Sequence, residues 1–164
     1  MRKIFILAIF IIATCVINDF AQSISKSDVQ KNEIEIEQFM GMLDGIYPDN
    51  LIDNMSYLLP SELKILNYSI GEFSDLGYYD LAIAYKDASC SYNTLKIILL
   101  VNIDNKSFKK VLEAEAEWRD NPFDVGFSIS KNTISLTHRR NKMWLFSSYC
   151  YNNERLKLLR EEMY

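Results

Sequence analysis

From Leu63 onward, polar and apolar residues alternate with a period of two in one short segment after another. Side chains of a β-strand point to opposite faces in turn, so this period is typical of strands that bury one face. Turn residues such as Asn105 with Lys106, and Lys131 with Asn132, separate the segments. We therefore expect an antiparallel meander of about eight strands. The expected strands are residues 64–70, 79–86, 94–103, 107–118, 125–130, 133–138, 142–151 and 154–160.

Such a meander can form a sandwich-like pair of sheets or two propeller-like blades, and in either case the fold class is mainly β. The segment 94–103 carries apolar residues on both faces, with Leu95 and Ile97 on one and Ile98 and Leu100 on the other. A strand that is apolar on both faces is expected at the centre of the fold.

Before Leu63 the apolar residues have helical spacing instead. Two sets of apolar residues each fall on one helical face, and Pro60 ends the second pattern. The first pattern consists of Val29, Ile36, Phe39, Met40 and Leu43, and the second of Leu51, Ile52, Met55, Leu58 and Leu59. Ser27 and Gln30 resemble a capping box ahead of the first pattern. We expect one or two helices on the N-terminal side of a β domain. The expected domains are a signal peptide at residues 1–21, a helical segment at 22–62 and the β domain at 63–164.

The N-terminal segment has the features of a secretory signal. Arg2 and Lys3 precede an apolar run of about 14 residues, too short to span a bilayer comfortably. Ala21 fits a cleavage site, so the protein is expected to be exported to the periplasm or secreted, without a transmembrane span after cleavage. Lipid attachment at Cys15 and an uncleaved anchor helix are the alternatives.

Charge and motif content exclude several classes of function. The formal net charge is −4, which does not favour a nucleic-acid surface. The chain has one histidine, and it contains no G-x-S-x-G, H-E-x-x-H or Walker-type motif. Neither a zinc site nor another cofactor is expected.

After removal of the signal, two cysteines remain, Cys90 and Cys150. In an oxidising compartment they can form one disulfide, provided that their Cα atoms lie within about 7 Å. Two buried free thiols are the alternative.

The stretch GEFSDLGYYDLAIAYK at residues 71–86 has the spacing of a worn loop motif. Other short motifs along the chain are LLPSELKIL, LKIILLV, NPFDVGFSIS, TISLTHRR and MWLFSSYCYNNERLKLL. Together they resemble a family of small exported bacterial proteins of unknown role that carry one integrin-like loop of the FG-GAP/VCBS type. The resemblance covers residues 58–160 and implies a binding role without an established activity.

In that family the loop can hold Ca²⁺ through carboxylate and amide oxygens. The corresponding positions here are Glu72, Ser74, Leu76 and Asp80, and Asp75 lies one place out of register. Leu76 has no oxygen ligand, whereas Ca²⁺ needs six to eight. Calcium is therefore possible but unfavoured, and we expect a metal-free turn in which Asp80 binds backbone amides.

The one dense group of positive charge suggests a surface for a partner. His138, Arg139 and Arg140 lie close to Trp144, and arginine with aromatic residues is typical of binding hot spots. A hairpin tip with solvated charges and a packed histidine is the structural alternative.

These observations favour a non-enzymatic binding or interaction protein of the bacterial envelope, whose partner is an unidentified protein or envelope ligand. An inhibitor of an exported enzyme, or an immunity protein against a toxin, is a narrower form of this hypothesis. The competing hypothesis is an envelope hydrolase that uses Asp80, Glu113, Glu115 and Asp124. It requires two of these carboxyl groups to converge in a concave pocket with displaced pKa values.

Overall fold

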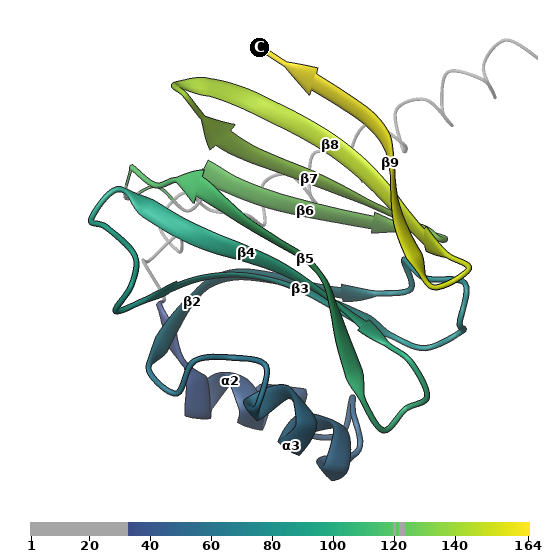
Figure 1. Cartoon of the computed structure of the whole chain (residues 1–164). Coiled ribbons are helices and arrows are strands. Elements are labelled where there is room, and N and C mark those ends of the chain that lie inside the picture. Colours follow the sequence, from purple (N-terminus) through teal and green to yellow (C-terminus); the bar gives the residue numbers. More distant parts are fainter. Residues whose placement is uncertain (1–32, 120, 122–123) are drawn as a thin grey trace, which may run out of the picture. The chain divides into compact units, whose positions relative to one another are not determined.

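One antiparallel sheet dominates the fold, as the alternating sequence predicts (Figure 1). The structure, a computed structural model, describes residues 33–119, 121 and 124–164. In this part of the chain the sheet has nine strands in the order β1-β2-β3-β4-β5-β7-β8-β9, and β6 pairs with β7 off this path. The strands are β1 Ile34–Glu35, β2 Leu63–Gly71, β3 Asp80–Asp87, β4 Thr94–Asn102, β5 Phe108–Glu117, β6 Val125–Ser130, β7 Thr133–Arg140, β8 Met143–Asn152 and β9 Arg155–Met163. The expected fold class is confirmed, and the two-residue β1 is the strand that the pattern did not predict.

Two short helices, α2 Ile36–Leu43 and α3 Asp49–Ser56, cover one face of β2–β5. Their apolar side chains, such as Phe39 and Leu51, share a core with Ile83 and Ile98 of the sheet. The first helix begins later than its spacing predicts, because residues 34 and 35 are extended and pair with β2. The capping-box residues Ser27 and Gln30, the signal segment and Cys15 lie outside the described residues.

The strands β6–β9 cover the other face of β2–β5. Ala84 and Ile97 pack there against Val125 and Leu136, so β3 and β4 are buried on both faces, as expected for the central segment. The two halves of the sheet are joined by one residue pair, Glu117 with Arg139. They therefore form one open sheet whose halves face each other in a sandwich-like way, without separate propeller-like blades.

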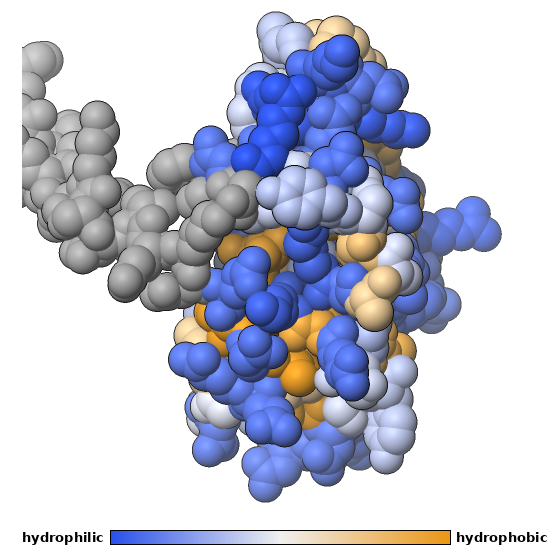
Figure 2. Space-filling view, turned by 90° about the vertical axis from the view of Figure 1, so that its left-hand side faces the viewer, coloured by the Kyte–Doolittle hydropathy of each residue, from blue (hydrophilic) through white to orange (hydrophobic). Residues whose placement is uncertain are grey.

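The meander gives the sheet two ends, which we name after the first and last residues of β3. The loop 72–79 and the β4–β5, β6–β7 and β8–β9 turns lie at the Asp80 end. The β3–β4 and β7–β8 turns lie at the Asp87 end. Figure 2 shows the side of the molecule that is at the left in Figure 1, with hydrophobic residues gathered in its lower half, at the height of the helices.

Both Cys90 and Cys150 are free thiols in the structure, so the predicted disulfide is absent. The reason is topological, since Cys90 lies in the β3–β4 turn at the Asp87 end, whereas Cys150 is near the Asp80 end of β8. No helix in the described part of the chain is long and apolar enough to cross a membrane.

Candidate functional site

The β7–β8 hairpin places the predicted binding residues at the Asp87 end of the sheet. Its turn residues Asn141 and Lys142 both have positive φ, at 52° and 67°. Two successive positive φ values are typical of the tight turn that matches the twist of paired strands. Lys142 also donates its backbone N–H to Glu117 Oε1 at 2.9 Å, which ties the turn to β5. The hairpin tip is therefore held in place by contacts beyond its own strands.

The four predicted binding residues do not form one cluster, because neighbouring residues of a strand face opposite sides. Arg139 pairs with Trp144, and both lie on the outer face of the sheet. His138 and Arg140 point to the other face, where they line a groove beside β5. The sequence hypothesis thus combined residues that the structure places on two separate surfaces of this hairpin.

On the outer face, Arg139 is fixed by two groups at once. Its guanidinium lies 4.8 Å from the centre of the Trp144 ring, within the range of a cation–π contact. Its Nε lies 3.7 Å from Oδ1 of Asp124, a buried carboxylate that also accepts the backbone N–H of Arg119 at 2.7 Å. The planar group of Arg139 is therefore oriented before any partner arrives.

Two further aromatic side chains extend this surface. Phe146 and Tyr164 make an edge-to-face contact with ring centres 5.6 Å apart, and they are 41% and 69% exposed. Backbone hydrogen bonds in both directions join Tyr164 to Trp144. We call Arg139, Trp144, Phe146 and Tyr164 the aromatic face. A shallow groove of about 600 Å³ runs across it, between Thr137 of β7 and Arg160 and Glu162 of β9.

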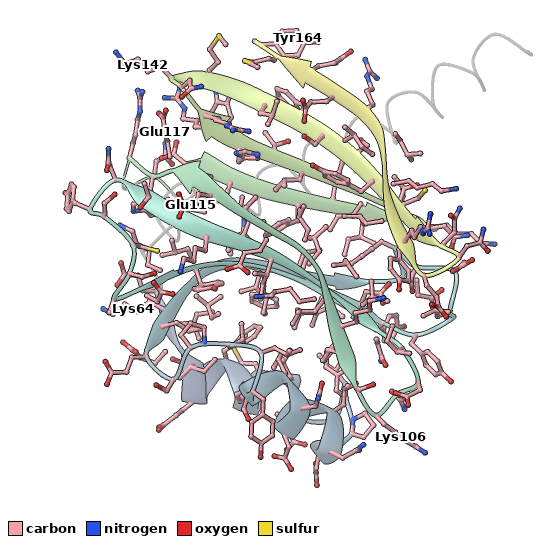
Figure 3. The ribbon with its side chains drawn as sticks, in the orientation of Figure 1. Lys64, Lys106, Glu115, Glu117, Lys142 and Tyr164 are labelled. Atoms are coloured by element: carbon pink, nitrogen blue, oxygen red, sulfur yellow. The ribbon has the colours of Figure 1, made fainter. Side chains whose placement is uncertain are left out.

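The groove on the other side is acidic, and we call it the acidic groove. Its volume is about 560 Å³, and Glu113, Glu115 and Glu117 of β5 line it together with Glu161 of β9. Figure 3 shows Glu115 and Glu117 near the same end of the sheet as Lys142. The groove exists because β5 pairs with β7 only through Glu117, which leaves most of that edge of β5 without a strand.

His138 lies at the wall of the acidic groove but is itself buried. Its Nδ1 is 3.3 Å from the carbonyl oxygen of Arg139. Burial is the main influence on the pKa of His138 and lowers it, and the contact with the Arg139 carbonyl does not outweigh this effect. The geometry matches the packed histidine that the sequence analysis gave as the structural alternative.

Only two of the four carboxylates of the hydrolase hypothesis lie at one groove, and they are neighbours on the same face of one strand. Glu113 and Glu115 line the acidic groove, whereas Asp80 and Asp124 are buried elsewhere and bind backbone amides. Among the described residues, no group of three or more His, Cys, Asp or Glu side chains is arranged to hold a metal ion.

In the calcium-like loop, Asp80 closes the turn on itself. Its carboxylate accepts the backbone N–H groups of Phe73, Ser74 and Asn102 at 2.8–3.0 Å, and the Ser74 hydroxyl at 3.2 Å. Gly77 has a φ of 76°, which suits a residue without a side chain. Asp75 is exposed, and Ser74 bonds to Asp80 through both its hydroxyl and its backbone amide. The loop thus forms the turn that the sequence predicts, while the resemblance to the repeat family stays a prediction.

Sequence reasoning missed Phe146, Arg160, Glu162 and Tyr164. The signal for Phe146 was present, because Trp144 and Phe146 are two residues apart on a predicted strand. The last strand was expected to end at residue 160, but β9 continues to Met163 and backbone bonds carry the pairing on to Tyr164. Only the longer strand places Glu162 opposite Phe146.

Comparison with known proteins gives no further indication of function. No protein-family model matches the chain, and no curated protein or solved structure matches it.

Proposed function

We propose that the protein is an exported, non-enzymatic binding module of the bacterial envelope, and that it engages its partner through the aromatic face. The observation that carries this proposal is the fixed position of Arg139 between Trp144 and Asp124, beside the exposed rings of Phe146 and Tyr164. Arginine and aromatic residues dominate the energetics of protein interfaces. A side chain that is already oriented loses less entropy on binding than a free one.

The neighbouring groups favour a partner with both polar and apolar groups. Thr137 and Ser135 of β7 supply hydroxyls along the shallow groove, and Arg160 and Glu162 form an ion pair at its edge. A peptide segment of another envelope protein would meet apolar rings at the centre and polar groups at the rim. This arrangement is typical of protein interfaces. An inhibitor or immunity protein would use the same surface, with an exported enzyme or toxin as the partner.

The hydrolase alternative has less support from the geometry. Asp80 and Asp124 are engaged by backbone amides, so neither is free to act on a substrate in the acidic groove. Glu113 and Glu115 lie at alternate positions of one strand, and neither Asp80 nor Asp124 lines the groove with them.

Site-specific photo-crosslinking in cells tests the proposal. A photoreactive phenylalanine analogue replaces Phe146 in one variant and Tyr92 in the control, since Tyr92 is also highly exposed but lies on the β3–β4 turn. We expect a discrete adduct from position 146 and not from position 92. Adding Arg139→Ala should remove this adduct, while Arg140→Ala should leave it in place. Identical adducts from both positions, or none from position 146, would refute the proposal.

A further inference from the structure

The strand β9 leaves one edge of the sheet open. It is the last strand in the sheet order and pairs with β8 on one side only. Unlike the two-residue strand β1 at the other end of the order, it has nine residues. Leu158 and Leu159 are 52% and 56% exposed, and Met163 is similarly exposed. A long open edge with apolar side chains is a ready site for pairing with another strand.

The charges of β9 are arranged unequally along its length. Arg155 and Lys157 lie near its beginning, and Glu161 and Glu162 lie near its end, where Arg160 forms an ion pair with Glu162 through one side of that carboxylate. An antiparallel copy of the same strand would set the basic part of each against the acidic part of the other. A parallel copy would set like charges against each other, which is unfavourable between directly opposite residues.

The two faces of β9 support the same arrangement. Lys157 and Glu162 are opposite Cys150 and Phe146, on the outer face of the sheet. Leu156 and Met163 are opposite the buried residues Tyr151 and Leu145, on the inner face. The register shifts between residues 158 and 160, so Leu159 is an extra residue in the ladder and the alternation changes phase there.

Because of this phase change, one antiparallel register brings Lys157 of each copy opposite Glu162 of the other. If Lys157 is placed opposite the partner's Glu162, Leu156 is opposite the partner's Met163 and Arg155 is opposite the partner's Tyr164. Lys157 then meets the partner's Glu162 on the outer face and Leu156 meets the partner's Met163 on the inner face. The two central leucines, Leu158 and Leu159, are opposite the partner's Glu161 and Arg160. Without the extra residue, Lys157 and Glu162 would lie on opposite faces and could not meet.

We propose that a second copy of this chain pairs with β9 as an antiparallel strand, about a twofold axis perpendicular to the sheet. The sheet then continues from one protomer into the other, and the pair of Lys157 with the partner's Glu162 occurs twice. This inference does not require the function proposed above, because it is argued from the edge of β9, although Glu162 also lies at the rim of the shallow groove. It also places the two aromatic faces on the same side of the dimer.

Charge reversal tests the pairing. The dimer contains two pairs of Lys157 with Glu162. In the Lys157→Glu variant each pair consists of two glutamates, and in the Glu162→Lys variant each pair consists of two lysines. We expect either variant to raise the dimer Kd by about tenfold or more, because attraction is replaced by repulsion at two positions. An equimolar mixture of the two variants should associate again, since every pair then contains one lysine and one glutamate.

The measurement is the molecular mass of the purified protein by analytical ultracentrifugation over a range of concentrations, with circular dichroism to verify the fold of each variant. Lys106→Glu is the matched control, because it makes the same charge change on the β4–β5 turn, far from Tyr164 in Figure 3. The wild type and this control should form dimers. A wild type that stays monomeric at all concentrations, or a mixture that associates no better than its components, would overturn the proposal.

Discussion

The first and last residues of β3 are both aspartates with little exposure to solvent, yet the protein stabilises them in different ways. Asp80 is surrounded by neutral donors, three backbone amides and one hydroxyl. Asp87 accepts bonds from Ser89 and lies 3.1 Å from the ammonium group of Lys96. One end of the strand therefore depends on backbone hydrogen bonds, and the other on an ion pair near the surface.

The two environments shift the carboxyl groups in opposite directions. Burial is the largest influence on the pKa of Asp80 and raises it, even though the bonds from Ser74, Asn102 and Phe73 oppose the shift. Burial also raises the pKa of Asp87, but the bonds from Ser89 and Lys96 outweigh it and lower the pKa to about 2. A buried carboxylate is therefore not in itself a sign of a catalytic role. Its donors decide whether the charged form is favoured.

The largest effect is expected when the Asp80 side chain is removed. Asp80→Ala leaves the amides of Phe73, Ser74 and Asn102 buried without an acceptor, so we expect a loss of about 4 kcal/mol in the free energy of unfolding. Asp87→Ala is the matched control, and it should lose about 2 kcal/mol, because its amide and ammonium partners can reach water. Urea unfolding measures both values. Equal losses would show that the two ends are stabilised in the same way.

A second prediction uses acid to separate the two ends. The pKa of Asp87 in the folded protein is about 2, against its ordinary value of 3.8. Its contribution to the free energy of unfolding is therefore complete at pH values above 3.8 and is lost as the pH falls through 2. The advantage of the wild type over Asp87→Asn should be about 2 kcal/mol at neutral pH, should be mostly lost by pH 2 and should vanish below it. Urea unfolding at a series of pH values measures it.

Asp80 should behave with the opposite sign. Its folded pKa is raised, so the stabilisation from its protonated form is complete below the ordinary value of 3.8 and is lost as the pH rises through the folded pKa. Relative to Asp80→Asn, the wild type should therefore gain stability on moderate acidification. The same direction of change for both aspartates would contradict the comparison.

The strands could be predicted from sequence because their signal is local. Alternation placed all eight long strands within a few residues of their observed bounds, and apolar residues on both faces identified β4 as central. The surface that we propose for binding depends on how β7, β8 and β9 pair, so the sequence pointed to only part of it. The contact between Arg139 and Asp124 continues the β6–β7 ladder by one step beyond Val125 and His138, and it could have been found only by fixing the register of that predicted hairpin, which alternation alone does not give.

A third prediction tests how tightly the halves of the sheet meet at the Asp80 end. A Cβ atom added to Gly71, the pairing partner of Asp80, would lie 2.8 Å from Cγ2 of Ile129 on β6. Gly71→Ala should therefore destabilise the protein by about 1–2 kcal/mol. The loss should be smaller when it is measured in an Ile129→Ala background, which removes the clashing atom.

The control for this prediction lies near the Asp87 end. A Cβ atom on Gly126 would be 3.9 Å from its nearest neighbour, the Cβ of Thr137, which is ordinary contact. Gly126→Ala should be neutral or stabilise the protein slightly, because it restricts the unfolded chain. Thermal unfolding of both variants measures the difference. Equal effects would mean that the contact between Gly71 and Ile129 is not tight enough to destabilise the protein.

The smallest effect on stability is expected at the aromatic face. Arg139→Lys keeps the charge near Asp124 but removes the planar group over the Trp144 ring, so we expect a loss of about 0.5–1 kcal/mol. Arg140→Lys, at an exposed position of the same strand, should have no measurable effect. A double-mutant cycle with Trp144→Leu isolates the contact, and a coupling energy near zero would contradict it. A small coupling is also what the proposed function requires, since a residue that contributes little to folding but is held in a fixed orientation is available to a partner. Arg139→Lys should then weaken crosslinking from position 146 more than it lowers stability.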